Sequence, residues 1–129
     1  MANYKVIGER PKIVELEDEK EVFGEVEEIT SRELGAEKAN IVKVTLWGPD
    51  FLHKHEIAEE TYVCLKGDGE IFLDGETFDF SEGERVIIPP GTLHATRPKR
   101  FFGKLVFLCI SSPPFDPKDV YNDPRGRDW

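Results

Sequence analysis

Hydrophobic and polar residues alternate along most of the chain with a period of two, the spacing typical of half-buried β-strands. In residues 39–47, for example, Val42 and Val44 fall on one face and Lys43 and Thr45 on the other. Further short runs predict strands at residues 51–55, 60–65, 70–73, 77–80, 85–88, 94–97 and 102–110. Many short strands at this spacing predict an all-β fold, a small antiparallel β-barrel or jelly roll with little helix.

Turn residues separate these runs. Asp74-Gly75 lies between two apolar runs and predicts a two-residue hairpin, because both turn positions require φ > 0. The only helical turn we expect is at residues 31–34, where Ser31 would cap the first turn and Gly35 would end it.

The two ends of the chain differ from its middle. The first 30 residues are acidic and predict a solvated edge strand and turn. Residues 111–129 contain four prolines and predict an extended tail, which Tyr121 and Trp129 would tie to the domain or to a neighbouring subunit. With no internal repeat, residues 1–129 are expected to form a single domain.

Charge and composition narrow the possible partners. The net charge of −9 would repel nucleic acid, and no apolar run approaches the roughly 20 residues that cross a bilayer. Residues 1–10 lack the features of a secretory signal, so we expect a cytoplasmic protein without nucleic-acid or membrane partners. One methionine, no glutamine and 33% charged residues are typical of a thermophilic source. Cys64 and Cys109 lie in apolar runs and are expected to be buried, unreactive thiols.

The three histidines of the chain carry its clearest chemical pattern. His53 and His55 share one face of a strand, because alternate residues point the same way. After four intervening residues, Glu60 opens the next run and can lie across the strand ladder from them, and His94 begins a further strand. Neutral imidazoles crowded in an apolar interior are costly without a cation, so His53, His55, Glu60 and His94 are candidate metal ligands.

The spacing of these residues follows two motifs. The first, written G(X)5HXH(X)3-4E(X)6G, is matched by His53, His55, Glu60 and Gly67, and the second, G(X)5PXG(X)2H(X)3N, by Gly83, Pro89, Gly91 and His94. The motifs and their intervening segment cover residues 48–98. They resemble the two motifs of the cupins, and their compact spacing is typical of small single-domain cupins. Gly48 stands one residue too close to the first histidine, and Pro98 replaces the final Asn. Glu59 is an alternative ligand, but the six-residue spacing to Gly67 favours Glu60.

The resemblance implies a divalent transition metal, which for three nitrogens and one oxygen could be Fe, Mn, Ni, Zn, Co or Cu. It also implies a small sugar, sugar phosphate or organic acid as substrate, for isomerase or lyase chemistry at two open metal positions. A metal-dependent dioxygenase and a non-catalytic binder of a metabolite are the alternatives.

Further residues are candidates for roles around that centre. Tyr62, Glu70 and Glu76 are candidate acid-base residues, provided that they point inward. A basic run could steer an anion or simply balance surface charge; it comprises Arg97, Lys99, Arg100 and Lys104. The resemblance also implies a homodimer, to which Lys12 to Leu16 and the tail could contribute.

Overall fold

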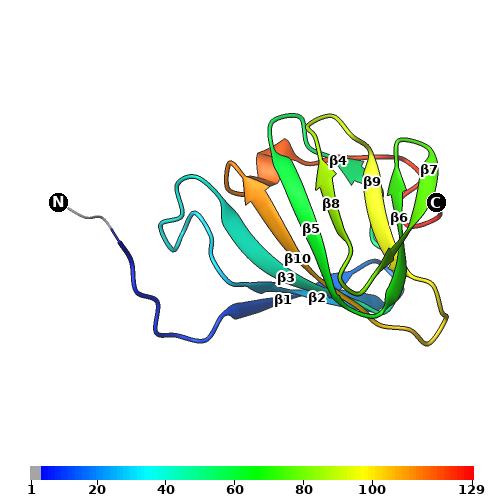
Figure 1. Ribbon diagram of the computed structural model, residues 1–129, viewed down its shortest axis with the longest axis horizontal. Coiled ribbons are helices and arrows are strands. Elements are labelled where there is room, and N and C mark those ends of the chain that lie inside the picture. The colour runs from blue at the N-terminus through cyan, green and yellow to red at the C-terminus, as the bar shows by residue number, and fades with distance from the viewer. Residues whose placement is uncertain (1–3) are drawn as a thin grey trace.

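The computed structural model describes residues 4–129, whose strands form two antiparallel sheets (Figure 1). The six-stranded sheet has the order β1-β2-β3-β10-β5-β8 and the five-stranded sheet the order β11-β4-β9-β6-β7. The strands are β1 (Lys12–Glu17), β2 (Val22–Glu28), β3 (Asn40–Leu46), β4 (His53–Lys54), β5 (Glu59–Lys66), β6 (Asp68–Leu73), β7 (Glu76–Ser81), β8 (Arg85–Ile88), β9 (His94–Pro98), β10 (Leu105–Ser112) and β11 (Tyr121–Asn122). A single 3-10 turn, η1 (Pro117–Asp119), is the regular helical segment in this part of the chain.

This arrangement confirms the all-β prediction and has the layered form of a jelly roll. The strand pairings among residues 4–129 leave two separate sheets rather than one closed barrel. Within the same range, no helix has the length and apolar character needed to cross a membrane.

The main core fills the space between the two sheets. Alternate residues of each strand point inward, so that Phe107 of β10 lies beside Val44 of β3 and Cys64 of β5 in the pairing of the strands. Phe80 and Ile71 of the five-stranded sheet complete the same buried cluster. One end of this core is polar, because the candidate metal ligands are also buried between the sheets.

The C-terminal segment covers the other face of the five-stranded sheet. The ring of Trp129 packs edge-on against Phe72 at 5.8 Å, and its Nε1 donates a hydrogen bond to the carbonyl oxygen of Asp50 at 2.7 Å. Tyr121 pairs with Lys54 across β11 and β4. The segment is therefore attached to the domain, but it forms η1 and β11 where the sequence predicts an extended tail.

The acidic N-terminal region forms a hairpin of β1 and β2. The sequence does not predict the second strand, because Glu25, Glu27 and Glu28 of β2 mask the alternation. Val26 lies on the inner face, whereas Glu25 and Glu27 point to the outer face of the sheet. The expected edge strand and turn are present, and one further strand extends the sheet.

Several predicted boundaries differ from the observed ones. Residues 51–55 contain only the two-residue β4, and β10 starts at Leu105 because Phe101 and Phe102 lie in an exposed turn. The predicted helix at residues 31–34 is wrong: these residues form a turn in which Ser31 Oγ accepts a hydrogen bond from the Leu34 amide at 3.2 Å. The Asp74-Gly75 hairpin is confirmed, with φ of 47° and 99°.

Candidate metal centre

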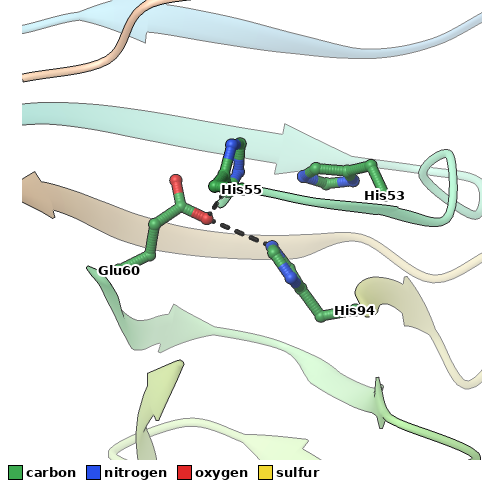
Figure 2. Close-up of side chains that lie close together, drawn as sticks. All are labelled: His53, His55, Glu60 and His94. Atoms are coloured by element: carbon green, nitrogen blue, oxygen red, sulfur yellow. Dashed lines mark hydrogen bonds and ion pairs between the residues drawn. The ribbon is translucent and has the colours of Figure 1, made fainter. Parts of the chain in front are cut away.

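Both sheets contribute to a cluster of three histidines and one glutamate. His53 lies in β4, His55 directly follows it, and His94 opens β9 opposite His53 in the strand pairing. Glu60 comes from β5 of the other sheet and faces them (Figure 2). One donor atom from each of the four side chains lies within 4.8 Å of the others.

Backbone carbonyls hold all three imidazoles in one tautomer. The Nδ1 atoms of His53, His55 and His94 lie 2.7, 2.9 and 2.8 Å from the carbonyl oxygens of Phe51, Asp119 and Thr92. Because a carbonyl can only accept, each Nδ1 must carry the proton and donate. The three Nε2 lone pairs are thereby left free, the arrangement in which histidine binds metals.

The Glu60 carboxylate is ionised and oriented by its neighbours. Its Oε1 lies 3.0 Å from Nε2 of His55 and 3.1 Å from Nε2 of His94. Burial opposes its ionisation, but when His55 and His94 carry a proton on Nε2 they outweigh burial and hold the pKa of Glu60 well below its ordinary value. The Cys109 thiol donates to Oε2 at 3.1 Å, and because burial and Glu60 raise the pKa of Cys109 well above its usual range, it remains a donor.

Asp119 of η1 fixes the loop that joins His55 to Glu60. Its carboxylate accepts hydrogen bonds from the amides of Glu56, Ile57 and Ala58 at 2.9 to 3.2 Å. Its carbonyl oxygen also accepts the Nδ1 proton of His55. Residues 117–119 thus set both the position of this loop and the direction of one imidazole.

The donor set fits a divalent transition metal. With Nδ1 protonated, His94 Nε2 and Glu60 Oε1 present lone pairs to each other, which a cation between them would satisfy. Nε2 of His55 is buried and has no aligned hydrogen bond to the described residues, although it lies near Glu60. Donors 2.0–2.2 Å from one ion lie about 3–4 Å apart, so this cluster needs only a slight contraction to share an ion.

The surroundings of the cluster shift the pKa values of His53 and His55 in opposite directions. Burial and the neighbouring His94 lower the pKa of His53 to about 4, so His53 is neutral at pH 7. Burial also disfavours a charge on His55, but the Glu60 carboxylate more than offsets it and raises the pKa of His55. The negative charge of Glu60 therefore attracts a positive charge to this position, either a proton or a metal ion.

A cavity of about 440 Å³ adjoins the cluster and contains a carboxylate that the sequence did not reveal. Asp50 lines this cavity, and its Oδ1 accepts a hydrogen bond from the Phe51 amide at 2.7 Å. Burial raises the pKa of Asp50 to about 6, which suits a group that exchanges protons near neutral pH. Asp50 precedes the histidines in a loop, where no periodic pattern indicates which way a side chain points.

The other candidates from the sequence have different surroundings. Tyr62 is buried beside the cluster, lines the cavity and places its hydroxyl 3.5 Å from Oε1 of Glu60. Glu70 forms an ion pair with Arg97 at 3.2 Å, and Glu76 is exposed on β7. Neither glutamate lines the cavity.

The basic run that could have steered an anion lies away from the cavity. Arg97 is held by Glu70 and by the Trp129 carbonyl oxygen, and Lys99 forms ion pairs with Asp68 and Asp79. Lys104 contributes to a hollow on the outer face of the six-stranded sheet. These side chains balance neighbouring acidic groups.

Comparison with known sequences places residues 45–110 in the family model described as the cupin domain. A protein of Methanocaldococcus jannaschii is 40% identical over 71 residues, which span 54% of this chain and 54% of that protein. A protein of Aquifex aeolicus is 38% identical over 102 residues, covering 78% of this chain and 82% of that protein. Quercetin 2,3-dioxygenase of Bacillus subtilis is 29% identical over 58 residues, 45% of this chain and 17% of that enzyme.

Solved structures share the fold at low sequence identity. Streptomyces Pac13, described as a nucleoside dehydratase, superposes with a TM-score of 0.73 at 16% identity, over 95% of this chain and 92% of that chain. Oxalate decarboxylase of Lactobacillus farciminis superposes with a TM-score of 0.70 at 21% identity, over 87% of this chain and 33% of that chain.

Proposed function

The chain belongs to the cupin family, and we propose on that basis that His53, His55, Glu60 and His94 hold one divalent transition-metal ion that acts on a small molecule. The observation that carries the proposal is the orientation of the imidazoles, each of which donates from Nδ1 to a backbone carbonyl. Nε2 of His55 and of His94 lies 3.0 and 3.1 Å from Glu60, and a donor atom of His53 lies within 4.8 Å of the other three donors. Iron, manganese, nickel, copper, cobalt and zinc all suit this donor set.

The chemistry that we propose is an isomerase or lyase reaction on an organic acid or a hydroxy-carbonyl compound. A bound divalent ion would act as a Lewis acid towards the oxygens of such a substrate. Asp50 would exchange a proton with the substrate, because its carboxyl group lines the cavity and its pKa of about 6 lets it do so near neutral pH. Tyr62 would orient the substrate through its hydroxyl group, which burial keeps protonated by raising its pKa well above the usual value.

Two solved structures with the same fold support this reaction class. The fold is shared with a nucleoside dehydratase and with an oxalate decarboxylase, both of which have names that denote lyase chemistry. A dioxygenase is the second candidate, because residues of this chain are similar in sequence to quercetin 2,3-dioxygenase. A protein that binds a metabolite without turnover is the third.

Metal analysis followed by oxygen-uptake measurements separates these candidates. The protein would be purified without added metal, its metal content measured by mass spectrometry, and oxygen consumption followed with hydroxy-carbonyl and hydroxy-acid substrates. Turnover without oxygen uptake supports the isomerase or lyase, whereas uptake coupled to substrate loss supports the dioxygenase. A protein that retains less than stoichiometric metal after incubation with each of the six ions contradicts the proposal.

We also propose that the protein forms a homodimer through β1. This strand ends the six-stranded sheet, so that within residues 4–129 one of its edges has no pairing strand. Tyr4 and Val6 precede it and are 80% and 88% exposed, in a segment that extends away from the domain (Figure 1). A second copy could cover these side chains and the strand edge. Light scattering coupled to gel filtration tests this, with deletion of residues 4–17, which removes β1, expected to yield a monomer.

A further inference from the structure

The cavity beside the candidate metal centre extends across the inner face of the six-stranded sheet. Its lining includes Glu60 of β5 at one end and Val14 of β1 at the other. Three strands lie between β5 and β1 in the order of the sheet, and neighbouring strands are about 4.8 Å apart. The cavity is therefore much longer than the metal-binding cluster and can take a ligand with a body as well as a coordinating group.

The floor of this cavity is a row of apolar side chains. Val14 pairs with Val26, Val26 with Val44, and Val44 with Phe107, so one row crosses four strands in register. All four residues line the cavity, and together they are called the valine row. Alternation along each strand sends the polar neighbours of these residues to the other face of the sheet.

A second apolar row lies beside the first. Val42 pairs with Cys109 and Cys109 pairs with Tyr62, and all three line the cavity. Asp50 and the histidines gather around the cluster, and Arg32 comes from the loop after β2. Glu28 of β2 pairs with Val42 and also lines the cavity, so the second row ends in a charged residue. The cavity is thus polar around the cluster and at the end of the second row, and apolar along the first row.

We infer that the ligand of this site is amphipathic, with two adjacent oxygens for the metal centre and an apolar aromatic or aliphatic body that lies on the valine row. The inference rests on the proposed function and names the substrate class of that same site. An apolar body gains about 25 cal/mol for each Å² removed from water. A polyol or a phosphate on the valine row would lose hydrogen bonds to water without finding partners among its apolar side chains.

Hydroxamic acids test the inference, because they present one constant pair of metal-binding oxygens on different bodies. Binding of acetohydroxamate, benzohydroxamate, octanohydroxamate and gluconohydroxamate to the metal-loaded protein would be measured by isothermal titration calorimetry. We expect benzohydroxamate and octanohydroxamate to bind at least about tenfold more tightly than acetohydroxamate, and gluconohydroxamate to bind no more tightly. A polyol ligand that binds as tightly as the apolar ones overturns the inference.

A pair of isosteric variants locates the effect. Val44→Thr places a hydroxyl group in the valine row, whereas Val63→Thr makes the same change in β5 at a position that does not line the cavity. Val44→Thr should weaken benzohydroxamate binding about tenfold and leave acetohydroxamate binding and metal content unchanged, and Val63→Thr should change neither. Val26→Thr, at a less buried position of the row, replaces Val44→Thr if the latter does not fold.

The metal content of each sample distinguishes the two possible failures. Stoichiometric metal with equal affinity for all four hydroxamates overturns the ligand class and leaves the metal centre intact. Absence of metal from the unsubstituted protein overturns the proposed function, and the ligand class with it. An equal loss of affinity for all four hydroxamates in Val44→Thr, with metal still bound, also contradicts an apolar contact between the ligand and the valine row.

Discussion

His55 donates a hydrogen bond from Nδ1 to the backbone carbonyl oxygen of Asp119, 2.9 Å away and 64 positions later in the chain. The carboxylate of the same aspartate accepts the amide protons of the loop that leads from His55 to Glu60. One residue of the C-terminal segment therefore positions two of the four candidate ligands. Residues with this role are important for metal affinity even though they do not contact the metal.

Replacement of this aspartate should weaken metal binding without abolishing it. Asp119→Ala leaves three loop amides without their acceptor, and we expect metal affinity to fall about 10- to 100-fold. Competition with a chelator of known affinity measures the change. Asp123→Ala is a suitable control, because that side chain pairs with Arg125 and is remote from the loop amides. Unchanged affinity in Asp119→Ala would contradict the positioning role.

Removal of one candidate ligand should have a larger effect. His55→Ala is expected to lose metal retention while the β-sheet circular dichroism spectrum stays largely intact, because the core between the sheets is unaffected. Lys54→Ala provides the control at the adjacent position, where the side chain forms an ion pair with Glu56. Metal retained at one equivalent by His55→Ala, as judged by mass spectrometry, would count against the assignment.

Asp50 should make the metal-free protein less stable as the pH rises from about 4 to 6. Its pKa is raised from 3.8 to about 6 on folding, so in this range the folded state binds a proton that the unfolded state has released. Stability falls with pH wherever the folded state binds more protons, and it levels off above pH 6. Asp50→Asn, which keeps an acceptor for the Phe51 amide, should therefore stabilise the protein at pH 7 by up to about 3 kcal/mol.

Urea unfolding at several pH values checks this dependence. The stabilities of the variant and the unsubstituted protein should converge below about pH 3, where Asp50 is protonated in both the folded and the unfolded state. If the variant is the less stable protein at pH 7, the carboxyl group does not carry the expected burial cost.

Two glycines with the same backbone conformation should differ in their tolerance of a side chain. Gly67 and Gly75 have φ of 101° and 99°. A Cβ atom at Gly67 would overlap the carbonyl oxygen of Lys104, whereas nothing lies within 4 Å of a Cβ atom at Gly75. Gly75→Ala should cost about 1–2 kcal/mol from backbone strain alone, and Gly67→Ala about 2–5 kcal/mol because steric overlap is added. Urea unfolding measures the stability of the two variants. Equal losses of stability would show that steric overlap does not explain the need for glycine at position 67.

The sequence predicts the parts of this protein that depend on local pattern. The short apolar run at residues 85–88, bounded by turn residues, gives the bounds of β8, and the hairpin at Asp74-Gly75 follows from its turn residues. The spacing of the histidines and Glu60 likewise predicts that they come together, although Glu60 faces the histidines from the opposite sheet and not, as predicted, across a strand ladder. β2 escapes prediction because its glutamates conceal its inward-facing residues.

Other parts depend on contacts that no local pattern encodes. Asp119 reaches the ligand loop only because η1 packs beside it, and Cys109 meets Glu60 only because β10 inserts beside β5. Asp50 points into the cavity from a loop, where the side-chain direction follows no period. The roles of these residues depend on the tertiary structure, so the sequence alone does not reveal that they belong to the site.

The place of β10 in the six-stranded sheet has a consequence for biosynthesis. This strand lies between β3 and β5, yet it is made after both of them. His53, His55 and Glu60 are therefore synthesised before β10, the strand that pairs with β5 and joins it to β3. The six-stranded sheet therefore cannot be completed until β10 has been made, because only β10 joins β5 to β3.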